Sequence, residues 1–253
     1  MLELFAIFAA GFWAGMINVV VGSGTLVTFP TLLLFGYPPL VANVSNNIGL
    51  VGGGITGTWG YRSELAGQGA RLRLLLPASA AGGITGALLL LVLPVGAFRA
   101  IVPVLITIGL VMVVAGPAMQ RRAARRRATG ESPARRVAIV AGVFLLGIYG
   151  GYFGAAQGVL IVGLLSVLTT QSIQSITGLK NLLTTAVNAL AAITFMIVSW
   201  DSVDWRVVAL IAAGATLGGL AGARFGRRLS PFLLRGLIIL IGLIALARLL
   251  FFS

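Results

Sequence analysis

The stretch from Gln174 to Trp200 carries the polar residues that are best placed to bind a ligand. It holds Lys180, the only lysine of the chain, inside an otherwise apolar run. Spacings of three, four, seven and eleven residues place its polar positions on one narrow face of a helix: Thr177, Lys180, Asn181, Thr184 and Asn188. An ammonium and two amides are costly against lipid, so we expect this face to line a protein interior or a water-filled cavity. We interpret it as half of a substrate site.

A second interpretation of Lys180 stays open at this level. The residue lies only about seven positions into its helix, so its long side chain can also snorkel to the membrane interface, while the asparagines join neighbouring helices.

Composition places these residues in a polytopic helical membrane protein. Hydrophobic residues make up 58% of the chain and charged residues 9%, with apolar runs long enough to cross a bilayer. The net charge is +13, but 17 of the 18 basic residues are arginines gathered mainly between apolar runs, which favours a role in membrane orientation over binding of nucleic acid. The chain has no cysteine and no histidine, so we expect no disulfide, no metal site and no cofactor. The first apolar segment has no basic residues before it, so we expect a retained helix and no cleaved signal peptide.

The apolar segments form two sets of five. They run over 4–21, 25–36, 40–60, 72–93 and 98–117, and then over 137–155, 158–169, 174–199, 206–223 and 232–252. The intervening residues include seven arginines and the helix breakers Gly130, Ser132 and Pro133. The sequence therefore predicts a first membrane repeat over 1–118, a linker over 119–136 and a second membrane repeat over 137–253.

The second segment of each set is too short to span a bilayer. Twelve residues reach about 18 Å along a helix, whereas the hydrocarbon core is about 30 Å thick. Breaks at Gly22-Ser23-Gly24 and Ala156-Gln157-Gly158 separate these segments from the preceding ones, and the two breaks lie 134 positions apart.

The same offset relates residues outside the breaks. Asn43, Asn46 and Asn47 fall on Thr177, Lys180 and Asn181, so both halves carry a polar trio at one helical spacing. With a small change of register, Gly82 and Gly86 match Gly214 and Gly218, and Phe98-Arg99 matches Leu234-Arg235. We interpret this as an internal duplication. The alternative is that richness in Ala, Gly and Leu makes any two membrane segments alike.

The arginines predict the orientation of the two halves. The linker 119–136, the loop 61–73 and the turn with Arg224, Arg227 and Arg228 should be cytoplasmic, and the acidic loop at Asp201 and Asp204 should lie outside. The corresponding loops of the two halves then lie on opposite sides. The expected fold is an all-α polytopic membrane protein with two inverted repeats, each a broken or re-entrant helix pair plus three transmembrane helices. Both termini are expected outside the cytoplasmic membrane.

In such repeats the breaks meet near the membrane midplane, and freed helix N-termini offer N–H groups to an anion. The expected substrate-binding residues are Ser23, Gly24, Thr25, Asn43, Asn46, Asn47, Gln157, Gly158, Thr177, Lys180, Asn181 and Asn188. The glycine clusters at 52–54, 82–83 and 218–219 are assigned to close helix packing. None of the five acidic residues lies centrally in an apolar run, so the site is neutral to positive and an anion is the expected substrate.

Several segments resemble the TauE/SafE sulfite-exporter family of bacterial membrane permeases. They are Pro39-Leu40-Val41-Ala42-Asn43-Val44, Thr58-Trp59-Gly60-Tyr61-Arg62, Gly178-Leu179-Lys180-Asn181, Asp204-Trp205 and Gly222-Ala223-Arg224. The resemblance covers essentially the whole chain and implies a transporter of sulfur-containing anions, such as sulfite, sulfonates or sulfoacetate, in the bacterial inner membrane. Many members have a fuller run of glycines where this chain has Gly22-Ser23-Gly24-Thr25.

Other classes of function were weighed against this expectation. A membrane-embedded enzyme needs a His, Cys or acid near a nucleophile or metal, and the apolar segments supply none. A permease for another small anion, or an accessory protein that transports nothing, remains as the alternative. The expected partners are the small anionic substrate and the lipid bilayer, with no nucleic acid; a homo-oligomer is left open.

Overall fold

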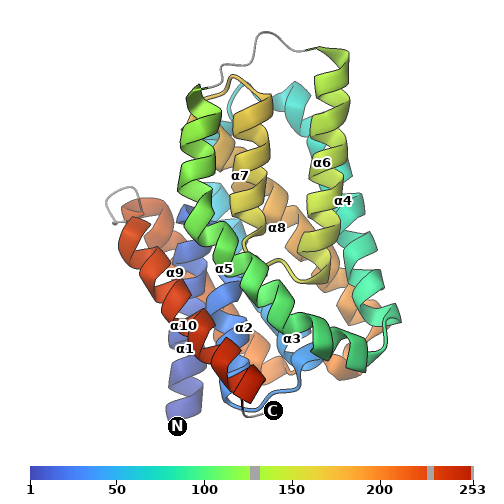
Figure 1. Cartoon of the computed structure of the whole chain (residues 1–253), viewed down its shortest axis with the longest axis vertical. Helices are drawn as coiled ribbons and strands as arrows, with labels where there is room; N and C mark the ends of the chain where they lie inside the picture. The colour runs from blue at the N-terminus through green and yellow to red at the C-terminus, as the bar shows by residue number, and fades with distance from the viewer. Residues whose placement is uncertain (126–131, 227–230, 252–253) are drawn as a thin grey trace.

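The computed structural model describes residues 1–125, 132–226 and 231–251 (Figure 1). These residues form α-helices joined by short turns and two 3₁₀ segments, so the expected all-helical fold is confirmed. The helices are α1 Leu2–Val20, α2 Thr25–Leu34, α3 Pro39–Gly60, α4 Gly69–Val92, α5 Val95–Arg125, α6 Pro133–Tyr152, α7 Gln157–Leu168, α8 Ile173–Val198, α9 Trp205–Phe225 and α10 Pro231–Phe251.

The helices follow the ten apolar segments, with small differences of extent. Helix α5 continues to Arg125, because alanine and arginine are strong helix formers, so residues 119–125 of the expected linker are helical. Ser132 caps α6 by accepting a hydrogen bond from the Arg135 backbone N–H at 3.3 Å, and α6 begins at Pro133. Residues 126–131 of the expected linker lie outside the described residues. Helix α7 begins at Gln157, so Gly158 lies within its first turn instead of before it.

Within the described residues, six helices are long and apolar enough to cross a membrane, over Leu2–Val20, Gly69–Val92, Gly96–Ala118, Pro133–Tyr152, Ile173–Val198 and Trp205–Phe225. Helix α3 is also long enough, with 22 residues, but it carries three asparagines that lower its apolar character. Helices α2 and α7, with 10 and 12 residues, reach only about 15 and 18 Å. The protein is therefore a multi-pass helical membrane protein with two short internal helices.

Each short helix folds back along the helix before it. Tyr37 follows α2, and its hydroxyl donates a hydrogen bond to Glu3 Oε1 at 2.7 Å. Because Glu3 lies at the start of α1, the end of α2 lies beside the start of α1. In the second hairpin, Gln171 follows α7 and lines one cavity with Arg135 and Ile139 near the start of α6. Figure 1 shows the result: α2 lies in the lower half of the molecule and α7 in the upper half. Both pairs therefore fold back as helical hairpins.

Glycines bring helices of the two halves into close contact. Helix α1 packs on α9, where Gly15 lies against Ala215 and Gly218 against Phe12. Helix α6 packs on α4, where Gly86 lies against Ile148. A methyl group at any of these glycines would collide with backbone, which confirms that glycine serves close packing here.

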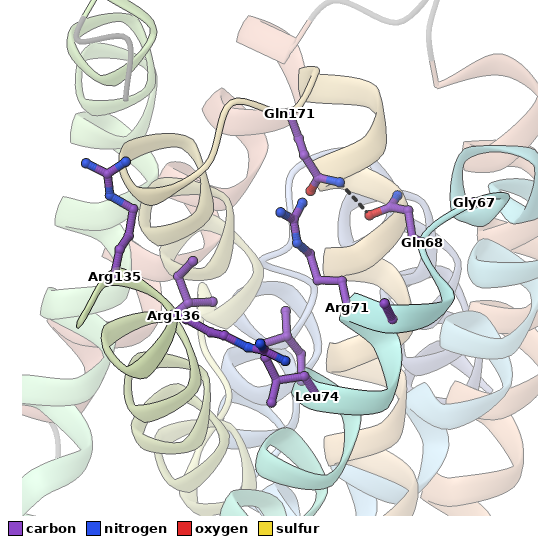
Figure 2. Close-up of a pocket in the computed structure, with 10 residues that line it drawn as sticks. Gly67, Gln68, Arg71, Leu74, Arg135, Arg136 and Gln171 are labelled. Carbon is purple, nitrogen blue, oxygen red and sulfur yellow. Dashed lines mark hydrogen bonds between the residues drawn. The ribbon is translucent and has the colours of Figure 1, made fainter. Parts of the chain in front are cut away.

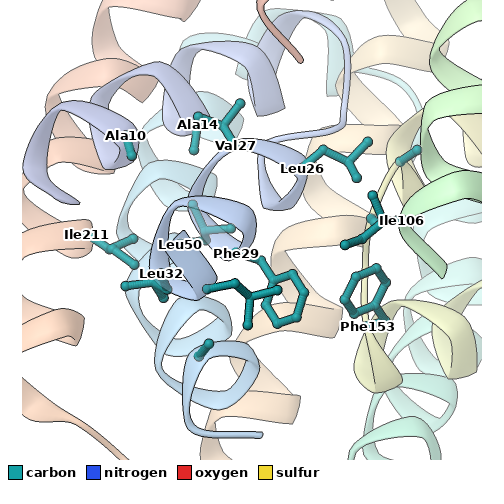
Figure 3. Close-up of a cluster of buried hydrophobic side chains, with 14 of the residues drawn as sticks. Ala10, Ala14, Leu26, Val27, Phe29, Leu32, Leu50, Ile106, Phe153 and Ile211 are labelled. Carbon is teal, nitrogen blue, oxygen red and sulfur yellow. The ribbon is translucent and has the colours of Figure 1, made fainter. Parts of the chain in front are cut away.

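The first hairpin lies in the main hydrophobic core (Figure 3). Leu26, Phe29 and Leu32 of α2 are fully buried, among side chains of α1, α3, α5 and α9. Phe29 packs edge-to-face on Phe153, with ring centroids 5.1 Å apart. Because Phe153 belongs to the break between α6 and α7, this contact joins the two hairpins in the interior.

Candidate substrate site

The two helix breaks touch each other through their backbones. The Gly158 N–H donates a hydrogen bond to the Gly22 carbonyl oxygen at 3.1 Å. A Cβ atom on Gly22 would lie 2.6 Å from Gly158 Cα, and the reverse substitution meets Gly22 Cα at the same distance. Only glycine at both positions permits this crossing, which we name the hairpin crossing (residues 21–24 and 153–158).

Equivalent positions in the two breaks share one backbone conformation. Gly22 has φ 89°, and Ala156, 134 positions later, has φ 58°. Among the described residues, Ala156 is the non-glycine residue with positive φ. A left-handed residue in each break turns the chain from one helix into the next, and in the second break an alanine does so at a cost of about 1–2 kcal/mol.

Lys180 lies at the hairpin crossing and is 1% exposed. Its Nζ donates hydrogen bonds to the carbonyl oxygens of Asn18, at 2.8 Å, and Val19, at 2.9 Å. These carbonyls belong to the last turn of α1, where helix carbonyls lack intrahelical donors and the helix dipole is negative. Lys180 therefore caps α1 and does not snorkel to the membrane interface.

A matching cap exists in the other half. Asn43 Nδ2, on α3, donates a hydrogen bond to the Tyr152 carbonyl oxygen at 2.9 Å, at the end of α6. Tyr152 follows Asn18 by 134 positions, the offset that relates the two breaks. Thus α8 caps α1 and α3 caps α6, so each polar helix holds the end of the first helix of the other half.

Three of the expected site residues have buried polar atoms without a hydrogen-bond partner. They are Ser23 Oγ, Asn47 Oδ1 and Asn181 Nδ2. All three side chains are at least nine-tenths buried. Buried polar groups without a partner are rare and point to a ligand or water that would complete them.

Other expected site residues have internal hydrogen bonds. The Gly24 N–H donates to Asn18 Oδ1 at 3.1 Å, and the Gly158 N–H to Gly22 as above, so these two amides already have acceptors. Gln157 Nε2 donates to the Leu146 carbonyl oxygen at 3.0 Å. Asn46 Oδ1 accepts from Thr28 Oγ1, a partner that sequence reasoning missed because a threonine in an apolar helix carries no distinctive signal. Thr25 and Asn188 are buried.

A small cavity of about 90 Å³ adjoins the hairpin crossing. It is lined by Val20 and Val21 before the first break, Val159 after the second, Thr177, one turn before Lys180, and Arg235 of α10. Arg235 Nε is buried without a partner, and Arg121 of α5 adds a second positive charge close to it. Sequence reasoning did not include Arg235 in the site; its match to Arg99 in the duplication was the only available signal.

Short, broken helices that meet inside a multi-pass helical bundle are typical of membrane transporters. The chain matches the family "Sulfite exporter TauE/SafE" over residues 7–249 and belongs to this family. The expected family is thereby confirmed, and its members are transporters and not enzymes.

Relatives of similar length are described as probable membrane transporters. The "Probable membrane transporter protein ORF9" of Sinorhizobium sp is 29% identical over 249 residues, which cover 96% of this chain and 91% of that protein. The "Probable membrane transporter protein YfcA" of Escherichia coli strain K12 is 27% identical over 253 residues, covering 100% and 91%. A "Probable membrane transporter protein" of Haemophilus influenzae is 24% identical, covering 99% and 96%. No solved structure gives a significant match.

Proposed function

We propose that the protein is a secondary transporter of small sulfur-containing anions, such as sulfite, sulfonates or sulfoacetate, which bind at the midplane between two repeats. The observation that carries this proposal is Lys180, an ammonium buried at the hairpin crossing and satisfied only by main-chain carbonyls. Carbonyl dipoles leave a full positive charge uncompensated in a medium of low dielectric. A bound anion supplies the negative charge that compensates it.

The distribution of acids supports an anion over a cation. Glu3 pairs with Tyr37 at one end of the molecule, and the Asp204 backbone N–H donates to Ser45 Oγ at the start of α3, at 2.9 Å. Glu64 lies beside α8 at the other end. None of these three carboxylates lies at the hairpin crossing, where a sodium or proton-coupled cation site would need one.

Reciprocal contacts support the two inverted repeats. The first helix of each half packs on the fourth helix of the other, as α1 on α9 and α6 on α4. The capped carbonyls of Asn18 and Tyr152 lie 134 positions apart, although the capping residues Lys180 and Asn43 do not match each other at this offset. Such reciprocal contacts, in which each half packs the same helices against the other, are expected of two units related by a twofold axis. Alternating access would then come from rocking of one set of helices against the other around the crossing.

The expected orientation also has support. The arginines of the loop 61–73 and those of the linker each predict a cytoplasmic position, independently of one another. Arg71 from the loop and Arg135 and Arg136 from the end of the linker line one cavity, so the two segments lie at the same end of the molecule. In Figure 1 the end of α5 and the start of α6 lie at the upper end, whereas the start of α1 lies at the lower end. On this orientation the cavity with Arg235 lies on the cytoplasmic side of the hairpin crossing, and we infer that a transported anion passes Arg121 and Arg235.

Transport by the purified protein in vesicles tests the proposal. Vesicles loaded with radiolabelled sulfite or sulfoacetate should lose label faster than protein-free vesicles, and unlabelled sulfonates should compete, whereas sodium gluconate should not. Transport of other small anions but none with sulfur would favour the alternative of a different anion permease. Absence of both transport and anion-dependent thermal stabilisation would favour an accessory membrane protein.

A further inference from the structure

A second, larger cavity lies between α4, α6 and the connection from α7 to α8 (Figure 2). Its volume is about 400 Å³, in the range of small-molecule sites. Arg71 of α4 and Arg135 and Arg136 of α6 line it, and no acidic side chain lines it among the described residues. The cavity therefore has a strongly positive lining that suits an anion.

The cavity has two layers along its helices. On α4, Leu74 and Leu75 follow Arg71 by one turn, and on α6, Ile139 follows Arg135 by one turn, and all three aliphatic residues line the cavity. The arginines thus lie toward the helix starts and the apolar side chains lie deeper in the membrane.

Two amides complete the polar layer. Gln171 Nε2 donates a hydrogen bond to Gln68 Oε1 at 2.8 Å, so both side chains are held at the cavity (Figure 2). Gln171 Oε1 is buried and has no partner. A carbonyl oxygen only accepts hydrogen bonds, so the arginine-lined cavity also offers one acceptor for a hydroxyl or amine donor.

We propose that this cavity binds an anionic phospholipid with a hydroxyl-bearing headgroup, of the phosphatidylglycerol type. The phosphate diester lies among Arg71, Arg135 and Arg136, a headgroup hydroxyl donates to Gln171 Oε1, and the acyl chains follow Leu74, Leu75 and Ile139. A free oxyanion would use the arginines and leave the apolar layer in contact with water, which is why a lipid fits better. The site is separate from the hairpin crossing and does not depend on which anion is transported.

Lipid binding to the full chain in detergent tests the proposal. Apparent melting temperature and native mass spectrometry should report phosphatidylglycerol bound more tightly than phosphatidylcholine. Arg71→Gln and Arg136→Gln should each lower the affinity about fivefold, because each arginine near an anionic lipid contributes about 1 kcal/mol. Gln171→Leu should reduce the preference for phosphatidylglycerol over phosphatidic acid.

Arg73→Gln is the matched control, since Arg73 is an exposed arginine of the same helix and does not line the cavity. It should keep the affinity of the unmodified protein. Equal losses in Arg71→Gln and Arg73→Gln would mean general attraction to a basic surface and would overturn the proposal. So would full stabilisation by glycerol phosphate alone, because the apolar layer would then have no role.

Discussion

At the scale of single residues, Lys180 combines two tasks. Two of its three N–H donors satisfy the open carbonyls of α1, and this holds the first break in place. In the proposed function, its charge and its third donor bind the anion. Asn43 performs the capping task alone in the other half, so the charge of Lys180 is not needed to close a hairpin.

This division predicts separate effects of Lys180→Gln on folding and binding. Glutamine can keep one hydrogen bond to the carbonyls, so stability without ligand should fall only modestly. Affinity for sulfite or a sulfonate should fall about 10- to 100-fold, the value of a lost charge-assisted hydrogen bond. Lys180→Arg should restore little, because Lys180 Cδ already lies close to Gly158 and leaves no room for a planar guanidinium.

Isothermal titration calorimetry measures the affinity of each variant for sulfite or a sulfonate, with the folded fraction of the samples held equal. Unchanged affinity in Lys180→Gln would mean that neutral donors, Ser23 Oγ–H and Asn181 Nδ2–H, hold the anion. The role proposed for the ammonium would then be wrong.

Gly22 and Ala156, which share a left-handed backbone conformation, should differ in how far substitution changes the stability of the protein. Gly22→Ala places a methyl group against the Gly158 backbone and should cost roughly 2–5 kcal/mol from overpacking and strain. Ala156→Gly should be nearly neutral, because relief of about 1–2 kcal/mol of strain is offset by a lost buried methyl group and by glycine's chain entropy. Melting temperatures in detergent compare them, and similar losses in both variants would contradict this account.

At the scale of elements, the apolar patterns predicted every helix, because burial in lipid requires long apolar segments and breaks need glycine or a polar residue. The extents of α5 and α7 were misjudged for local reasons. Residues after Pro117 are good helix formers despite their charge, and Gly158 is tolerated in a first helical turn. The fold-back of α2 could not be predicted, since length alone fits either a crossing or a re-entrant hairpin.

The contact that closes the first hairpin predicts a pH dependence. Tyr37 lies in the loop between α2 and α3, where burial first and the hydrogen bond to Glu3 second raise its pKa from 10.0 to about 12. The folded protein thus holds the phenol proton more tightly than the unfolded chain. This stabilisation is complete below pH 10 and is lost as the pH rises toward 12.

Tyr37→Phe lacks this group, so the melting temperature of the unmodified protein should exceed that of the variant at pH 8 and approach it between pH 10 and 12. The difference between the two proteins removes the contribution of other titrating groups. A gap that stays constant across this range would show that the Glu3 contact does not stabilise the hairpin.

At the scale of the whole molecule, the offset of 134 residues was readable in the sequence, because the helix breaks and the polar trios of α3 and α8 both repeat at it. The sequence did not reveal which expected site residues have internal partners. Asn43 donates to the Tyr152 carbonyl oxygen, and Asn46 accepts from Thr28. Asn47 and Asn181 lie in the same two polar trios, but each has a buried polar atom without a partner. Side-chain partners across helices depend on crossing angles, which apolar patterns do not encode. Arg235 was missed for the same reason.

The membrane orientation gives the last prediction. The chain has no cysteine, so single cysteines report position without background. Ala66 and Gln174 are exposed at the end that carries Arg71 and Arg135, and Leu2 and Asp201 are exposed at the segments expected outside. A membrane-impermeant maleimide added to intact cells should label Leu2→Cys and Asp201→Cys, and should label Ala66→Cys and Gln174→Cys only after the cells are opened. Because the loops 61–73 and 199–204 follow equivalent helices, opposite labelling is required of inverted repeats, and labelling of all four from one side would refute both the orientation and the inversion.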